Sequence, residues 1–157
     1  MSGTSGPTLA GFNIFVYNVM LIDPLVLPTT SAVIGYAYNV ALGVVNQALM
    51  GAGCPPGSQW SIYAMAVYNL GGSNLINYAQ DQPGYTYFND QRTNFGITKF
   101  QPGVVAGTSD AGTAVSLLNP EFMRNLTLAN LQQLKDPWGR AYLQFAQDYG
   151  PSIWGIS

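Results

Sequence analysis

The sequence predicts a mainly α-helical protein, a helical bundle of four to five helices with an extended N-terminal arm and a C-terminal tail. Two observations predict this class. No charged residue lies between Pro24 and Gln80, and two segments of this run place apolar residues at helical spacing. Serine or threonine precedes the helical segments, and Gly/Pro-rich sequence follows them. Because 157 residues is the length of one domain, we expect a single helical domain over residues 1–157.

Residues 1–29 are expected to form the extended arm. The stretch "FNIFVYNVMLI" at 12–22 mixes β-branched and aromatic residues, and Pro24 and Pro28 follow it. A residue before proline is biased away from the helical conformation. Phe12, Phe15 and Tyr17 are therefore predicted to make contacts outside the bundle.

Residues 30–100 are expected to form a helical hairpin region, which begins with "SAVIGYAYNVALGVVNQALM" at 31–50. Thr30 or Ser31 can cap this first helix, and "GAGCPPG" stops it near residue 50. Gly35, Asn39 and Gly43 recur every four residues on one side of it. Such a stripe of small or polar residues predicts a seam where another backbone packs closely, either within a buried hairpin or between subunits.

The second helix is expected to begin at Ser58 and to run to Gln80, with Trp60, Tyr63 and Val67 at helical spacing. The Gly-Gly-Ser sequence at 71–73 is expected to interrupt it, by a stop and restart or by a kink. A short helix is expected at 89–94.

The last third is expected to contain a loop at 101–117, helices within 118–151 and a tail at 152–157. Gly, Ser, Thr and Ala dominate the loop without a helical stripe, and Thr127 can cap the helix that follows. Asp136 followed by Pro137 predicts the start of the final helix. In this helix the residues Trp138, Tyr142, Phe145 and Ala146 share one face. The apolar tail residues Ile153, Trp154 and Ile156 are expected to dock on this subunit or on its neighbour.

Charge is scarce and unevenly placed. Charged residues make up 8 % of the chain, against about 25 % in soluble domains. Asp23 is the only charged residue before Asp81, and the first basic residue is Arg92. Nucleic acid is therefore not expected as the main partner, since phosphate binding needs clustered Lys and Arg. So little charge also predicts that much of the surface is covered by another subunit.

The chain offers almost no catalytic chemistry. It has no histidine, its single cysteine, Cys54, lacks a predicted catalytic partner, and its carboxylates fall on different predicted elements. Asp136 and Asp23 are better explained as cap and turn formers. We expect no catalytic residue, no cofactor and no metal ligand, and hence a protein that is not an enzyme.

A membrane span at 31–50 is the sharpest alternative. Twenty residues would cross a bilayer, but Asn39, Asn46 and Gln47 lie among them and no Lys or Arg flanks them. A buried hairpin or an intersubunit seam is favoured over a pair of membrane spans.

The order of the two uncharged helices, the loop "VVAGTSDAGTAVSLL" and the closing "LTLANLQQLKDPWGRAYLQFAQDYGPSIWGIS" resembles small neck proteins of tailed bacteriophages. These are the head-to-tail adaptors or connectors that form a ring beneath the portal. The resemblance covers most of residues 30–157, and the closing segment carries most of it. It implies that residues 31–80 belong to the bundle and that the loop and the tail reach other rings.

The resemblance thus implies a structural virion component that forms a homo-oligomeric ring in the neck and joins the portal and head to the tail. The implied partners are further copies, the portal protein and other neck or tail proteins. DNA would pass through the channel without specific binding, and no membrane would be involved. The protein would be found in the virion, assembled in the host bacterial cytoplasm. A capsid decoration protein, another tail structural protein and a small holin-like membrane-active protein remain alternatives.

Overall fold

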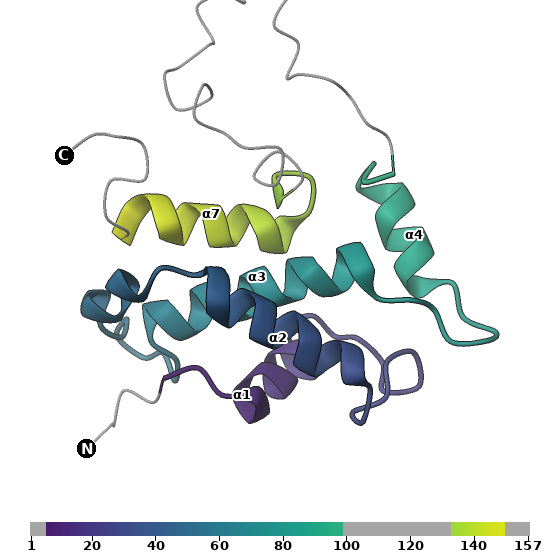
Figure 1. The fold of residues 1–157 in the computed structure, drawn as a ribbon, viewed down its shortest axis with the longest axis horizontal. Helices are drawn as coiled ribbons and strands as arrows, with labels where there is room; N and C mark the ends of the chain where they lie inside the picture. The colour runs from purple at the N-terminus through teal and green to yellow at the C-terminus, as the bar shows by residue number, and fades with distance from the viewer. Residues whose placement is uncertain (1–5, 99–132, 150–157) are drawn as a thin grey trace, which may run out of the picture.

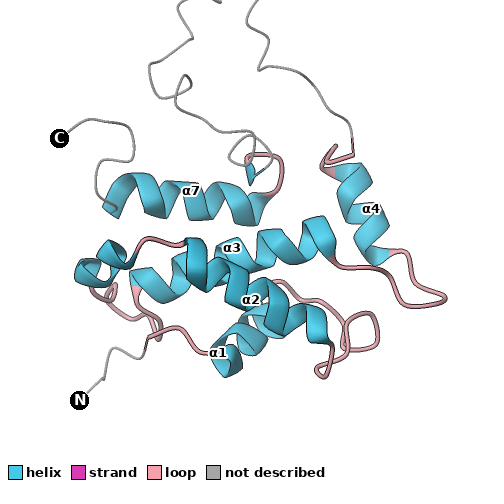
Figure 2. Cartoon of the chain, viewed as in Figure 1, coloured by secondary structure: helices cyan, strands magenta, loops and turns pink. Residues whose placement is uncertain are grey.

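The computed structural model describes residues 6–98 and 133–149, and within these ranges the fold is helical without a β-strand (Figures 1 and 2). This confirms the mainly α-helical class. In chain order the elements are α1 (Leu9–Ile14), the π-helix η1 (Phe15–Val19), α2 (Ala32–Val44), the 3₁₀-helix η2 (Gln47–Ala52), α3 (Ile62–Tyr78), α4 (Tyr87–Asn94) and α7 (Pro137–Tyr149). The predicted loop at 101–117, the Thr127 cap and the tail at 152–157 lie outside the described residues.

Helix α3 is the centre of the fold, with α2 and α7 packed along it (Figure 1). Its residues are uncharged and buried almost all round, as expected for a helix that other elements surround. The helix begins at Ile62 rather than at the predicted Ser58, because the Ser61 hydroxyl accepts from the Ala64 amide at 3.1 Å. The Ser58 hydroxyl instead accepts from the Trp60 amide within the preceding turn.

The predicted stop and restart at 71–73 is wrong, since α3 runs through it without a break, and the alternative of a kink stays a prediction. Both glycines are needed there as contact points. A Cβ on Gly71 would come within 2.8 Å of the Phe12 ring, and a Cβ on Gly72 within 2.9 Å of the Met20 sulfur. The N-terminal segment therefore packs directly against the backbone of α3 at the two glycines.

The predicted extended arm is also wrong for residues 9–19, which are helical in α1 and η1. The Thr8 hydroxyl caps α1 by accepting from the Gly11 amide, and Phe12, Phe15 and Val16 form a buried face at helical spacing. Pro24 and Pro28 restrict only the residues directly before them, so they leave this segment free to be helical.

The first long helix, α2, is shorter than the sequence predicts. The prediction ran to about residue 50, whereas α2 ends at Val44 and the extended backbone of Val45 carries that side chain into the core. The Asn46 side chain then accepts from the Ala48 amide and starts η2. The uncharged run is thus divided into two helices by a buried valine and an asparagine cap.

The helix predicted at 89–94 is confirmed as α4, which starts earlier at Tyr87, and the helix predicted after Asp136 is confirmed as α7. The predicted inner face of α7 holds: Trp138, Tyr142 and Phe145 pack against the core and Ala146 is buried. The ring of Trp138 meets the ring of Phe15 edge-on at 5.5 Å between centroids. Residues from both ends of the chain therefore share one aromatic cluster.

Candidate interaction surface

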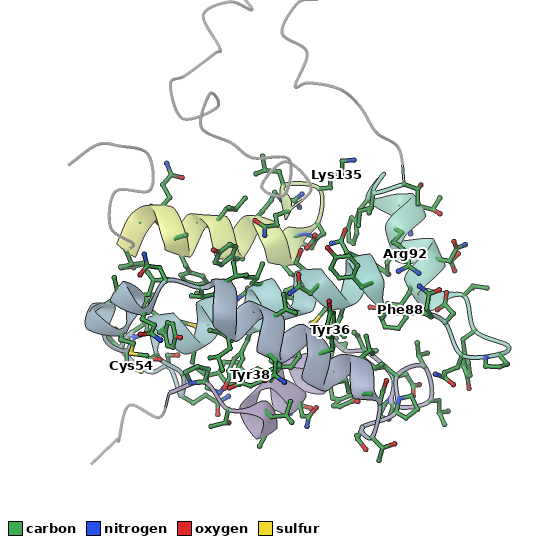
Figure 3. The ribbon with its side chains drawn as sticks, viewed as in Figure 1. Tyr36, Tyr38, Cys54, Phe88, Arg92 and Lys135 are labelled. Carbon is green, nitrogen blue, oxygen red and sulfur yellow. The ribbon has the colours of Figure 1, made fainter. Side chains whose placement is uncertain are left out.

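The outer face of α2 consists of the exposed residues Ala32, Tyr36, Asn39 and Gly43, with the half-buried Gly35 beside them. Nothing lies within 4 Å of a Cβ built on Gly35 or on Gly43, so no other part of the described chain packs closely there. Tyr36 is 61 % exposed (Figure 3). Among the described residues, the stripe predicted as a packing seam is consequently an open, uncharged surface.

A second group of exposed apolar side chains comes from the segment between residues 9 and 25. We call these the N-terminal aliphatic residues: Leu9, Ile14, Val19, Leu21 and Leu25. The only charge among residues 6–80 is Asp23, and one of its carboxylate oxygens accepts from the Leu25 amide in a tight turn. Asp23 is thus a turn former, as predicted, and this surface is nearly free of charge.

Leu21 is the most exposed of the N-terminal aliphatic residues, at 76 %. It is the only non-glycine residue with a positive φ in the described ranges, at 56°. The Ile22 amide donates to the Val16 carbonyl at 3.2 Å across the end of η1, and Leu21, just before Ile22, occupies a left-handed position. Glycine is preferred at that position, and a side chain there costs about 1 kcal/mol. Neither the turn nor the core of this subunit explains a leucine at this place.

Some of the residues that were predicted to make contacts outside the bundle lie elsewhere in the structure. Phe12 and Phe15 are buried in the core, so the prediction that they reach outside the bundle is wrong; helix formation turns both rings inward. Tyr17 is half-buried, and its hydroxyl donates to the Leu27 carbonyl at 2.8 Å. Ile153, Trp154 and Ile156 lie outside the described residues, so their predicted docking stays a prediction.

Two charged residues, Arg92 (Figure 3) and Asp81, join α3 to α4. The guanidinium of Arg92 on α4 donates to three carbonyls near the end of α3, those of Ile76, Asn77 and Ala79. In return Asp81, which follows α3, accepts from two amides at the start of α4. Each residue thus satisfies the exposed backbone groups of the other helix.

Asp136 forms a buried polar cluster between α3 and α7. Its carboxylate is fully buried, accepts from the Ser73 hydroxyl and from the Gly139 amide at 2.8 Å each, and lies 3.5 Å from the Asn77 amide nitrogen. Burial raises the pKa of the Asp136 carboxyl above its ordinary value, while the hydrogen bonds from Gly139, Ser73, Asn77 and the Trp138 amide oppose this rise. The predicted cap is confirmed, with a link to α3 that the sequence did not indicate.

In the described ranges no three His, Cys, Asp or Glu residues cluster as they would around a metal ion. Cys54 is exposed, and its thiol lies 3.2 Å from the Ser58 carbonyl and 3.3 Å from the Trp60 carbonyl (Figure 3). Helices long and apolar enough to span a bilayer are lacking from residues 6–98 and 133–149.

No known family, curated protein or solved structure matches this chain. The surface chemistry and the fold therefore carry what can be inferred about function. Sequence reasoning found the outer face of α2 from its four-residue period, but it missed Leu21, Leu25, Ser73 and Asn77. Only Leu25 had a local signal, since an apolar residue between two prolines in a turn is open to solvent.

Proposed function

We propose that this chain is a structural, self-associating virion protein that forms a ring in the neck of a tailed bacteriophage and joins the portal and head to the tail. The observation that carries self-association is the open, uncharged outer face of α2. Exposed helices of isolated domains normally present charged residues to solvent. Here the whole of α2 is uncharged and its outer glycines leave room for a neighbouring backbone.

The N-terminal aliphatic residues support the same proposal. The exposed Leu21 in its strained backbone position slightly lowers the stability of the isolated subunit. A contact with another subunit would explain why a leucine stands there. Lasting subunit contacts are more apolar than transient ones, so exposed apolar side chains suit such a contact. A ring subunit also needs two lateral contact surfaces, and the chain offers two uncharged groups of exposed residues.

The place in a phage neck rests on the resemblance of residues 30–157 to head-to-tail connector proteins. In the proposed ring the neighbours are further copies, the portal protein and other neck or tail proteins, and DNA passes without specific binding. The scarcity of basic residues agrees with a channel to which a moving duplex does not adhere.

The first experiment is quantitative mass spectrometry of gradient-purified virions, which counts copies of this chain per portal subunit and per major capsid subunit. Near parity with the portal supports a neck ring. A count that scales with the capsid would instead make the chain a decoration protein. Absence from particles would contradict any virion role and would return attention to the membrane-active alternative.

Self-association is tested separately by light scattering and native mass spectrometry of the purified protein. Gly43→Leu is the matched variant, because Gly43 is exposed and nothing among the described residues lies within 4 Å of a Cβ built there. We expect an unfolding midpoint that is raised slightly by the gain in helix propensity, together with a loss of higher-order species. Retention of both stability and assembly would show that the outer face of α2 is not a close contact.

A further inference from the structure

The attachment of α7 to the rest of the fold depends on a buried carboxyl group. Asp136 immediately precedes α7, and its carboxylate, 0 % exposed, accepts from the Gly139 amide inside α7 and from the Ser73 hydroxyl on α3. The bond to Gly139 caps α7, and the bond from Ser73 crosses the junction between the two helices and joins residues 63 positions apart along the chain. Any change in the charge of this group therefore acts directly on the α3–α7 contact.

The donors to Asp136 are neutral: the Ser73 hydroxyl, the backbone amides of Gly139 and Trp138, and the side-chain amide of Asn77. A buried carboxylate is stabilised best by a cation in direct contact, and neutral donors offset only part of the lost hydration. The protonated carboxyl fits the same site, because its O–H can donate to the Ser73 oxygen while the other oxygen still accepts from Gly139.

The elements packed around Asp136 carry other charged and titratable groups, and their positions are as follows. Arg92 of α4 donates to carbonyls at the end of α3, and Arg140 of α7 donates to the Leu134 and Lys135 carbonyls. The Lys135 amine lies 3.4 Å from the Gly96 carbonyl. Of the other acids on α4 and α7, Asp90 and Asp148 are exposed, and η2 has no titratable side chain. The phenols on α3, η1 and α7 are Tyr63, Tyr68, Tyr78, Tyr17, Tyr142 and Tyr149.

We propose that α7 is a proton-controlled clasp, held most firmly on α3 when Asp136 is protonated and loosened when that carboxyl ionises. Release of α7 removes the ring of Trp138 from Phe15 and opens the inner aromatic cluster to solvent or to another protein surface. The clasp does not depend on the proposed place in a phage neck.

The direction of the pH effect follows from linkage. Burial places the pKa of docked Asp136 above its ordinary value of 3.8, so the docked state binds the proton more tightly than the undocked state. Docking is strongest below the ordinary value and weakens as the pH rises through the docked pKa. The docking equilibrium changes about tenfold for each pH unit that separates the docked and undocked pKa values.

Hydrogen exchange tests the clasp on the full chain. Protection factors are measured for the amides of α7 and α3 between about pH 4 and pH 7. A protection factor already corrects for the intrinsic exchange rate, and the ratio of the α7 value to the α3 value corrects for global unfolding. We expect this ratio to fall with rising pH in the wild type and to stay constant in Asp136→Asn, at the acid level of the wild type. Asp148→Asn, an exposed change on the same helix, should keep the wild-type profile.

A flat wild-type ratio would overturn the clasp, and so would an Asp136→Asn profile that still falls with pH. If Asp136→Asn does not fold, carbon NMR of the wild-type carboxyl groups decides: an Asp136 midpoint above 3.8 supports the clasp, and one at or below it overturns the clasp. Ser73→Ala is an independent test. It removes a hydrogen-bond donor to the ionised Asp136 carboxylate, so the titration midpoint of Asp136 should move to higher pH.

Discussion

The phenyl ring of Phe12 lies directly against the α-carbon of Gly71. A Cβ at position 71 would stand 2.8 Å from two ring carbons, closer than such atoms approach in proteins. Phe12 is fully buried, and the rings of Phe15, Tyr38 and Tyr68 surround it, so it has little room to move. This contact fixes the N-terminal helix on the central helix.

Gly71→Ala should therefore destabilise the protein. The added methyl group gains helix propensity of up to about 1 kcal/mol but forces the packed rings apart, which typically costs about 1–3 kcal/mol. We expect a net loss, measured as a lower urea midpoint. Gly35→Ala is the matched control, because nothing lies within 4 Å of its Cβ and only the propensity gain remains. Equal midpoints for the two variants would contradict direct packing at Gly71.

Leu21→Gly should stabilise the isolated subunit while weakening self-association. Glycine relieves the left-handed strain at φ 56°, although its greater freedom in the unfolded chain offsets part of the gain. We expect a rise of up to about 1 kcal/mol in unfolding free energy, together with weaker higher-order assembly in light scattering.

The control for the stability part of that prediction is Leu25→Gly, which removes another exposed leucine where φ is not positive. This change should lower stability by about 0.5–1 kcal/mol, because only the entropy of the unfolded chain changes. If Leu21→Gly leaves assembly intact, the exposed leucine is not part of a subunit contact.

Arg92→Gln should loosen the junction between α3 and α4. The guanidinium serves three carbonyls of α3, and glutamine is too short and has too few donors to replace it. We expect a loss of about 1–2 kcal/mol by urea unfolding. Arg140→Gln provides the comparison, since Arg140 is exposed and an effect below about 0.5 kcal/mol is expected. Similar losses in both variants would argue against a special role for Arg92.

Asp81→Asn should weaken the start of α4. Each carboxylate oxygen of Asp81 accepts one amide, from Phe88 and from Asn89, and asparagine keeps only one acceptor oxygen. We expect faster hydrogen exchange in α4 and a loss of about 1 kcal/mol. Asp90→Asn on the same helix should have little effect, because its amide oxygen can still accept from the Thr86 hydroxyl. Unchanged hydrogen exchange in α4 of Asp81→Asn would rule out a stabilising role of Asp81 at the start of this helix.

Local sequence signals were sufficient to predict structure where neighbouring residues satisfy the hydrogen bonds of the backbone beside them. Asp136 and Pro137 specify the start of α7. The Asp136 side chain caps the helix, and Pro137 has no backbone N–H that would need a hydrogen-bond partner. They were insufficient at Gly71 and Gly72, where glycine lowers helix propensity and only the contacts with Phe12 and Met20 explain an unbroken helix.

The sequence by itself determined the helical class, the final helix and its buried face, and the absence of charge over α2 and α3, because these depend on composition, spacing and capping within a few residues. Only the tertiary structure decided that Phe12 faces inward, that Leu21 faces outward and that Asp136 meets Ser73. Each of these depends on which distant segment fills the space beside a side chain, and residues far apart along the chain carry no local trace of that choice.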